Sequence, residues 1–158
     1  TMVILDNRGT AMTGFQPHPG LPVNAMQESA PPVEIENICR GIGVETEIRD
    51  PFDLKGTRDA LLSFLEKKEG ARVLILRQAC SLSPEKKKKS LFKVRVDENA
   101  CRGERCGCNR LCTRIFRCPG LYWDNRKQVA RIDDVVCAGC GVCASICPAG
   151  AILKEDAV

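Results

Sequence analysis

The chain has few aromatic residues and lacks the features that mark membrane and secreted proteins. Only 4% of its 158 residues are aromatic, and no nucleic-acid recognition motif occurs, so its basic segments give little support to nucleic-acid binding. No signal peptide opens the sequence, and no apolar run is long enough to span a bilayer. We therefore expect a soluble, cytoplasmic protein with neither a membrane nor a nucleic acid as its partner.

Cysteine, in contrast, is abundant and clustered. The chain holds 11 cysteines, and nine of them fall between positions 101 and 147. A disulfide scaffold normally belongs to a secreted chain in an oxidising compartment, whereas clustered cysteines in an intracellular chain indicate metal ligands. Cys39 lies on the apolar side of a predicted helix and is expected in a core, and Cys80 is expected to have a structural role.

Residues 137–148 carry the most specific motif, Cys-x2-Cys-x2-Cys-x3-Cys-Pro. Three thiolates at this spacing wrap one 4Fe-4S cube, and the fourth, before proline, binds a second cube. The motif therefore predicts a partner motif elsewhere in the chain. A zinc site is the alternative, but zinc sites often use two separated Cys-x2-Cys pairs, which this overlapping run does not provide.

A weak internal repeat supplies the partner motif. Val96–Cys101 parallels Ile132–Cys137, and Cys118-Pro119 parallels Cys147-Pro148, although 16 residues separate the cysteines of the first half and 9 those of the second. The second cluster is assigned to Cys137, Cys140, Cys143 and the crossing Cys118. The first is assigned to Cys101, Cys108, Cys112 and the crossing Cys147. Cys106 is then spare or replaces Cys108, and a different or incomplete first cluster remains an alternative.

Charge and aromatic residues near these cysteines also fit a cluster domain. Residues 81–118 hold 11 Lys/Arg and 4 Asp/Glu, a net charge of +7. Anionic iron–sulfur clusters beside these residues would balance the excess positive charge. Tyr122 and Trp123 follow the first Cys-Pro and are expected to cover a cluster. Residues 80–90, which include four consecutive lysines, are expected to form a solvated linker, with a docking patch for an acidic partner as the alternative.

Residues 1–79 show the pattern of an α/β domain. Strands are predicted at 2–6, 45–49 and 73–76, and helices at 33–42 and 54–68, the latter with Asp53 as its N-cap. This alternation predicts right-handed crossovers and a parallel sheet, and the unbroken apolar run 73–76 is typical of a strand covered on both faces. Three strands make a thin domain, so we expect residues 1–79 to be the tail of a larger domain.

The N-terminal motifs resemble a known family. The runs are Leu5-Asp6-Asn7, Thr10-Ala11-Met12-Thr13-Gly14, Gln16-Pro17-His18-Pro19-Gly20, Asp50-Pro51-Phe52-Asp53-Leu54-Lys55 and Arg77-Gln78-Ala79-Cys80. In this order they closely resemble the end of the thiamine-diphosphate domain in the alpha subunit of indolepyruvate ferredoxin oxidoreductases. The resemblance continues into a two-cluster ferredoxin domain and covers essentially the whole chain.

The resemblance implies a fold and a division of the chain. Residues 1–79 would be the C-terminal part of a thiamine-diphosphate-binding α/β domain with a partial parallel sheet. Residues 91–158 would be an α+β, bacterial-type ferredoxin domain with two 4Fe-4S clusters. Together they would be the electron-transfer part of an enzyme that oxidatively decarboxylates aryl 2-oxoacids and passes electrons to ferredoxin.

The resemblance also implies site residues and partners. Asn7 and the carbonyl of Gly9 would bind Mg2+ on the thiamine diphosphate, while Thr10, Thr13 and Gln16 would line the cofactor or support its loop. The family's upstream Gly-Asp-Gly is absent, so this chain alone is not expected to be catalytically complete. A second (beta) subunit, an external ferredoxin, coenzyme A and an aryl 2-oxoacid are the implied partners.

Two alternatives stay open. His18, the only histidine, suits a general acid or base near the substrate, but a loop histidine between prolines is also typical of a structural or exposed residue. The whole chain could instead be a non-catalytic, ferredoxin-type electron carrier with an α/β docking appendage. An upstream Gly-Asp-Gly would favour the enzyme.

Overall fold

The computed structural model describes residues 1–83 and 92–156, while the side chains of Glu104 and Cys106 lie outside this description. The chain divides into two compact units, Thr1–Ser83 and Pro84–Val158. Residues 80–83 of the predicted linker belong to the first unit, where the N–H of Cys80 donates to the carbonyl of Asn7 at 3.0 Å. Residues 84–90 of the predicted linker lie outside the described residues.

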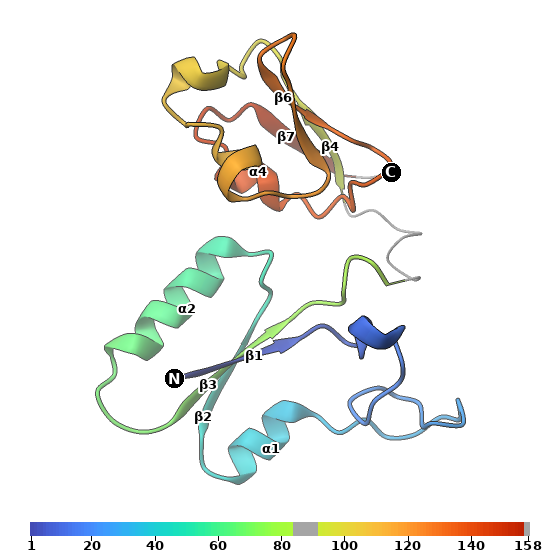
Figure 1. Ribbon diagram of the computed structural model, residues 1–158. Helices are drawn as coiled ribbons and strands as arrows, with labels where there is room; N and C mark the ends of the chain where they lie inside the picture. The colour runs from blue at the N-terminus through green and yellow to red at the C-terminus, as the bar shows by residue number, and fades with distance from the viewer. Residues whose placement is uncertain (84–91, 157–158) are drawn as a thin grey trace. The chain divides into compact units, whose positions relative to one another are not determined.

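The first unit is a three-stranded parallel sheet with one helix on each face (Figure 1). The strand order is β1-β3-β2, so β3 lies in the middle. The elements are β1 (Met2–Asp6), the short 3-10 helix η1 (Ala11–Thr13), α1 (Ile35–Gly41), β2 (Glu45–Arg49), α2 (Leu54–Glu66) and β3 (Arg72–Arg77). The predicted alternation and the parallel pairing are confirmed.

Both helices are slightly shorter than predicted, for local reasons. The first begins at Ile35, because Glu34 is extended, with φ −83° and ψ 121°, and so cannot continue a helix toward the prolines before it. The second begins at Leu54 as predicted, and Asp53 caps it by accepting the N–H of Gly56 at 3.0 Å. It ends at Glu66, because Lys67 is extended.

Alternate residues of β3 build two small cores on opposite faces of the sheet. Val73 and Ile75 pack with Cys39 of α1, and Leu74 packs with Ala60 and Phe64 of α2. The side chains of Leu74 and Ile75 are completely buried. Burying one such side chain contributes about 1.5–3 kcal/mol, so β3 accounts for much of the unit's stability. The predictions of a doubly covered strand and of a core role for Cys39 are confirmed.

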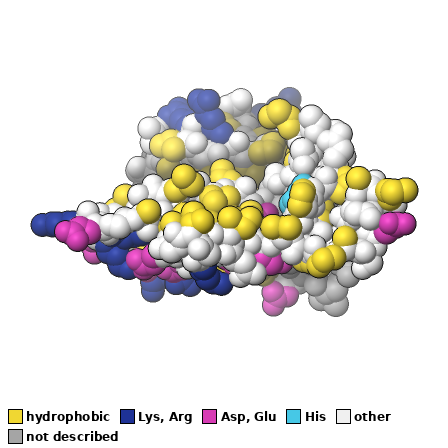
Figure 2. Space-filling model, turned by 90° about the horizontal axis from the view of Figure 1, so that it is seen from below, with side chains coloured by type: hydrophobic (Ala, Val, Ile, Leu, Met, Phe, Trp, Pro, Cys, Tyr) yellow, Lys and Arg dark blue, Asp and Glu magenta, His cyan; other side chains and the backbone are white. Residues whose placement is uncertain are grey.

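One edge of this sheet keeps much of its apolar surface exposed. Among the described strands β1 pairs only with β3, and its residues Val3 and Leu5 are 44% and 76% exposed. Other apolar side chains of the same unit, such as Ile38 and Ile42 on or just after α1, are also exposed. Figure 2 shows apolar side chains spread over the face of the molecule in view. This unit therefore offers apolar surface that its own helices do not cover.

The second unit contains two antiparallel strand pairs, β4–β7 and β5–β6 (Figure 1). Its elements are β4 (Phe92–Val96), the 3-10 helix η2 (Gly103–Cys106), the π-helix η3 (Leu111–Ile115), β5 (Leu121–Asp124), β6 (Val129–Ile132), α4 (Val142–Ile146) and β7 (Ile152–Asp156). Each pair joins a strand of the first half to a strand of the second, so the halves interlock. Within the described ranges, neither unit has a helix long and apolar enough to cross a membrane.

Candidate functional site

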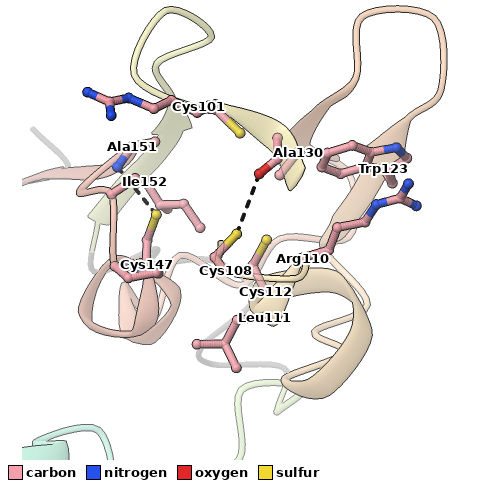
Figure 3. A pocket seen from close by; sticks show the side chains of 14 residues that line it. Cys101, Cys108, Arg110, Leu111, Cys112, Trp123, Ala130, Cys147, Ala151 and Ile152 are labelled. Carbon is pink, nitrogen blue, oxygen red and sulfur yellow. Dashed lines mark hydrogen bonds between the residues drawn. The ribbon is translucent and has the colours of Figure 1, made fainter. Parts of the chain in front are cut away.

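Four cysteines from separate segments line one cavity of the second unit, and we call them the first sulfur set. They are Cys101, Cys108, Cys112 and Cys147. Figure 3 shows their sulfur atoms facing a common space. Cys101 follows β4, Cys108 and Cys112 come from the segment of η2 and η3, and Cys147 crosses from the other half of the repeat. These are the four residues that the sequence assigned to one cluster.

The titration of Cys112 reflects this gathering. Burial raises the pKa of its thiol, and the neighbouring Cys108, Cys147 and Cys101 raise the pKa further. Thiols influence one another in this way only over short distances, so the four groups share one environment. Metal binding to such thiols would release their protons. The side chain of Cys106, the alternative ligand, lies outside the described part of the chain.

A second group of four cysteines, the second sulfur set, gathers on the other side of the repeat. Burial raises the pKa of Cys143 to about 12, with Cys140, Cys118 and Cys137 as further causes. Burial also raises the pKa of Cys137, and Cys118 and Cys140 add to that effect. Cys118, Cys137, Cys140 and Cys143 therefore lie close enough for their charges to influence one another. Three apolar side chains pack between and beside the two sets, namely Val94, Leu121 and Ile152.

The same turn holds the first cysteine of each half. In the first half, Asp97 accepts the N–H of Asn99 through its carboxylate and the N–H of Cys101 through its carbonyl, both at 2.9 Å. In the second half, the carboxylate of Asp133 accepts the N–H of Val135 at 3.0 Å and its carbonyl that of Cys137 at 2.8 Å. The repeat seen in the sequence is therefore a repeat of geometry.

Backbone N–H groups point at several of the sulfur atoms. The N–H of Ala151 donates to the sulfur of Cys147 at 3.3 Å, and the N–H of Gly139 lowers the pKa of Cys137 against the effect of burial. Gly139 and Gly141 both adopt a positive φ, 62° and 73°, which supports the prediction that they form tight turns. Such donors stabilise thiolates and tune the potential of a bound cluster.

The donor set fits 4Fe-4S clusters. Each set consists of thiols alone, and sulfur is the donor that iron–sulfur clusters use. Among the described residues, no three Cys, His, Asp or Glu side chains converge closely enough to hold a single metal ion. A cube binds each thiolate to a different iron atom, so it takes sulfurs that surround a space, as the first sulfur set does (Figure 3). The crossing of Cys118 and Cys147 between halves is the pattern of two-cluster ferredoxins.

Trp123 lies against the first sulfur set, in agreement with the prediction that Tyr122 and Trp123 cover a cluster. Its side chain lines the same cavity, and the guanidinium of Arg110 lies over its ring, 4.2 Å from the centroid (Figure 3). The indole nitrogen is buried and has no hydrogen-bond partner among the described residues. Tyr122 is 45% exposed, so it covers little. The Arg110 contact was not predicted, because nothing in the local sequence pattern marks it.

The predicted thiamine residues form a small, self-bonded loop after β1. The side-chain oxygen of Asn7 accepts the N–H of Gly9 at 3.1 Å. The N–H of Thr10 donates to the carbonyl of Gln16 at 3.3 Å, and the hydroxyl of Thr13 bonds the side chain of Gln16. The structure thus places Asn7 with Gly9, and Thr10 and Thr13 with Gln16, at the carboxyl end of a parallel strand, where α/β sheets bind ligands.

His18 lies in a different hollow. Its Nδ1 accepts the N–H of Gly20 at 3.1 Å, which leaves Nε2 as the second ring position. Its neighbours in a hollow of about 360 Å³ are mostly apolar, and they include Pro17, Leu21 and Val23. Figure 2 shows the histidine, in cyan, among apolar side chains. The polar contact that the structure gives His18 is with Gly20 rather than with Asn7.

An ion-pair network that was not predicted from the sequence lies at the carboxyl ends of β1 and β3. Arg77 donates to Asp6 at 2.7 Å and to both oxygens of Glu36, at 2.9 and 2.6 Å. The Arg77 hydrogen bond lowers the pKa of Glu36 to about 2. Burial alone would raise the pKa of Asp6, but the bonds from Arg77 and the backbone of Arg8 hold it below its usual value. The sequence did offer one signal for this network, because the apolar strands β1 and β3 end in the charged residues Asp6 and Arg77.

Comparisons with known proteins found a family model and several relatives. The family model of the 4Fe-4S binding domain matches residues 130–153. Indolepyruvate oxidoreductase subunit IorA of Methanothermobacter thermautotrophicus is 43% identical over 155 residues, which are 98% of this chain and 24% of that protein. Subunit IorA of Pyrococcus horikoshii is 36% identical over 158 residues, 97% of this chain and 23% of that protein. The chain thus spans about a quarter of the length of these relatives.

A shorter relative is a ferredoxin. An uncharacterized ferredoxin of Methanocaldococcus jannaschii is 38% identical over 64 residues, which are 39% of this chain and 94% of that protein. No solved structure matches the chain.

Proposed function

Because the chain belongs to the family of indolepyruvate oxidoreductase subunit IorA, we propose that it carries electrons through two 4Fe-4S clusters within a 2-oxoacid oxidoreductase. The observation that carries the proposal is the crossed arrangement of the two sulfur sets. Each half of the repeat gives three thiols to its own set and one to the other. Such sharing holds two clusters near each other, which is what single-electron transfer between them requires.

We further propose that the first unit forms part of a thiamine-diphosphate site. Asn7 and the carbonyl of Gly9 would bind Mg2+, and Thr10, Thr13 and Gln16 would support the loop beside it. The side-chain oxygen of Asn7 accepts one N–H and retains a second lone pair, so it remains a suitable oxygen ligand for a hard cation. The exposed apolar surface of β1 supports a site completed by further structure. Bound thiamine diphosphate would supply the carbanion chemistry of decarboxylation.

The remaining partners follow from the same proposal. An aryl 2-oxoacid of the indolepyruvate type would be the substrate, coenzyme A would accept the acyl group, and an external ferredoxin would accept the electrons. A second (beta) subunit would complete the enzyme, in the cytoplasm. The residues of this chain would contribute the sulfur sets, which receive and pass on electrons, and the loop after β1. His18, held through Nδ1 by Gly20, remains a candidate proton donor or acceptor at Nε2.

The proposal is tested by the metal content of the anaerobically purified chain. Two complete clusters give about eight iron atoms and eight sulfides per chain, and two interacting signals in the electron paramagnetic resonance (EPR) spectrum of the reduced protein. About four irons would mean that only one sulfur set is filled. A colourless protein that contains zinc would refute the electron-transfer function.

The ferredoxin relative favours one second candidate function. It aligns with part of this chain over nearly its own full length, and the 4Fe-4S family match lies in the second unit, so that unit could work as a ferredoxin by itself. In that case the chain would be an electron carrier, and the first unit a docking appendage. Indolepyruvate-dependent reduction of ferredoxin by the complete complex, lost when Asn7 is replaced by alanine, would decide for the enzyme.

A further inference from the structure

A hollow of about 460 Å³ lies next to the first sulfur set. Its lining consists of Asn99, Ala100, Arg102, Arg105, Pro148 and Ala149, and we call it the arginine hollow. Arg102, Pro148 and Ala149 also line the cavity that the four sulfur atoms face. A single layer of residues therefore separates the arginine hollow from the first sulfur set, so a redox group docked there would be close to the first cluster.

The charge of the arginine hollow is not neutralised within the described residues. Arg102 and Arg105 are exposed, and neither side chain has an ion-pair partner in the part of the chain that the structure describes. Some exposed cations elsewhere in the same unit are paired, as Arg95 is with Glu155 at 2.9 Å and Lys127 with Glu98 at 2.7 Å. The hollow therefore presents two guanidinium groups that have no anionic partner among the described side chains.

The two arginines stand on a fixed turn. The N–H of Arg105 donates to the carbonyl of Arg102 at 3.1 Å within η2. Between them, Gly103 has a φ of +60°, and a Cβ at this position would lie 2.5 Å from the carbonyl oxygen of Gln128. The turn therefore packs closely on the β5–β6 hairpin, in a way that only glycine allows. A fixed turn loses little conformational entropy when a partner binds.

We propose that the arginine hollow is the docking point of an acidic electron-carrier protein. Carboxylates of the carrier would pair with Arg102 and Arg105, whose planar guanidinium groups bind carboxylates through two parallel hydrogen bonds. One electron would then leave the reduced first cluster, which is oxidised, and enter the redox centre of the carrier, which is reduced, with no bond made or broken. This inference rests on the proposed function, because it requires a cluster at the first sulfur set.

The test compares two double variants of the chain in its complete complex, R102Q/R105Q and the control K93Q/R95Q. Both remove two exposed positive charges from the second unit, but Lys93 and Arg95 lie on β4 and do not line the arginine hollow. The measured quantity is the rate of reduction of an acidic bacterial ferredoxin divided by that of methyl viologen. The viologen rate and the iron content report the state of the clusters in each variant.

At low ionic strength the ratio is expected to fall roughly tenfold in R102Q/R105Q and less than about twofold in the control, because steering between opposite charges raises association rates by 10-fold or more. The dependence of the ratio on salt should flatten in R102Q/R105Q alone. The single variant R105Q alters the hollow without touching the lining of the sulfur cavity, so it gives the answer if the double variant loses iron.

Four results would overturn the proposal. Equal losses in both double variants would mean that overall charge, rather than this hollow, attracts the carrier. An unchanged ratio in R105Q and R102Q/R105Q would place the docking point elsewhere. Binding of single-stranded RNA that R102Q/R105Q abolishes, with ferredoxin reduction intact, would assign the hollow to a nucleic acid. An iron-loaded wild-type chain that reduces viologen but not ferredoxin would refute the ferredoxin partner itself, before any variant is compared.

Discussion

The two units of the chain are stabilised by different means. In the first unit, β3 lies buried between α1 and α2, and apolar side chains fill both faces of the sheet. The second unit has two separate strand pairs, and four of the eight sulfur-set cysteines pack as partly buried members around its apolar cluster. We therefore expect the first unit to fold on its apolar pattern, and the second to need its sulfur ligands to be satisfied. This contrast leads to predictions that affect one unit and spare the other.

Removal of a crossing ligand should have the largest effect, confined to the second unit. C118A and C147A each take one thiol from one sulfur set, so each should lower the iron content from about eight to about four atoms per chain. Metal binding and folding are coupled in small metal-dependent domains, so residues 92–156 should lose hydrogen-exchange protection while residues 1–83 keep theirs.

The control for this prediction is C80S, which changes a cysteine outside both sulfur sets. It should retain all its iron. If residues 92–156 kept full hydrogen-exchange protection after complete removal of iron, the apolar cluster around Val94 would be enough to hold the second unit folded. That result would contradict the proposed difference between the two units.

The next largest effect should lie in the first unit. R77Q leaves two largely buried carboxylates, Asp6 and Glu36, without their shared cation. Removing one partner of a buried ion pair costs about 3 kcal/mol of unfolding free energy. This loss can be measured by urea denaturation, with hydrogen exchange in α1 as the readout. The matched control, R58Q, breaks an exposed pair with Asp59 and should change the unfolding free energy by less than about 0.5 kcal/mol. If R77Q lost no more unfolding free energy than R58Q, the network would add no stability beyond that of an exposed ion pair.

A smaller difference in stability is expected between alanine variants of two glycines in the second unit that share a backbone conformation. Gly141 and Gly107 both have a φ of +73°, so alanine strains each by about 1 kcal/mol. A Cβ on Gly141 would also lie 2.8 Å from Cδ2 of Phe92, whereas nothing lies within 4 Å of one on Gly107. G141A should therefore lose about 1–2 kcal/mol more than G107A in anaerobic thermal unfolding. Equal losses would mean that the Phe92 ring moves aside freely.

The same contrast explains what the sequence could predict. In the first unit the apolar periodicity located all five main elements and their parallel pairing, because burial on two faces leaves a strong pattern. In the second, the spacing of cysteines and the Asp-to-Cys repeat predicted the two sulfur sets that the structure gathers. The assignment of these cysteines as cluster ligands remains a prediction for iron analysis to test.

Features that depend on distant or irregular segments escaped the sequence. Arg77 meets Asp6 across 71 positions, and no local pattern encodes such a pairing. The longer first half accommodates its extra residues in η2 and the π-helix η3, with Asn109 and Arg110 both at positive φ. Non-glycine residues seldom adopt that conformation, so a periodicity argument does not anticipate it. These same extra residues supply Arg102, Arg105 and Arg110, which distinguish the first sulfur set from the second.

The smallest effect should be a pH dependence of the first unit. Glu36 has a pKa of about 2 in the folded unit, against an ordinary value of 4.5, because Arg77 binds its carboxylate. A depressed pKa means that the stabilising contribution is complete above pH 4.5 and is lost as the pH falls toward 2. Between pH 7 and 5 the urea midpoint at α1 should therefore stay level, and it should begin to fall between pH 5 and 4. E36Q should lack this fall, whereas E66Q, at the exposed end of α2, should keep it. An equal fall in E36Q would assign the pH dependence to Asp6, whose pKa the same arginine lowers.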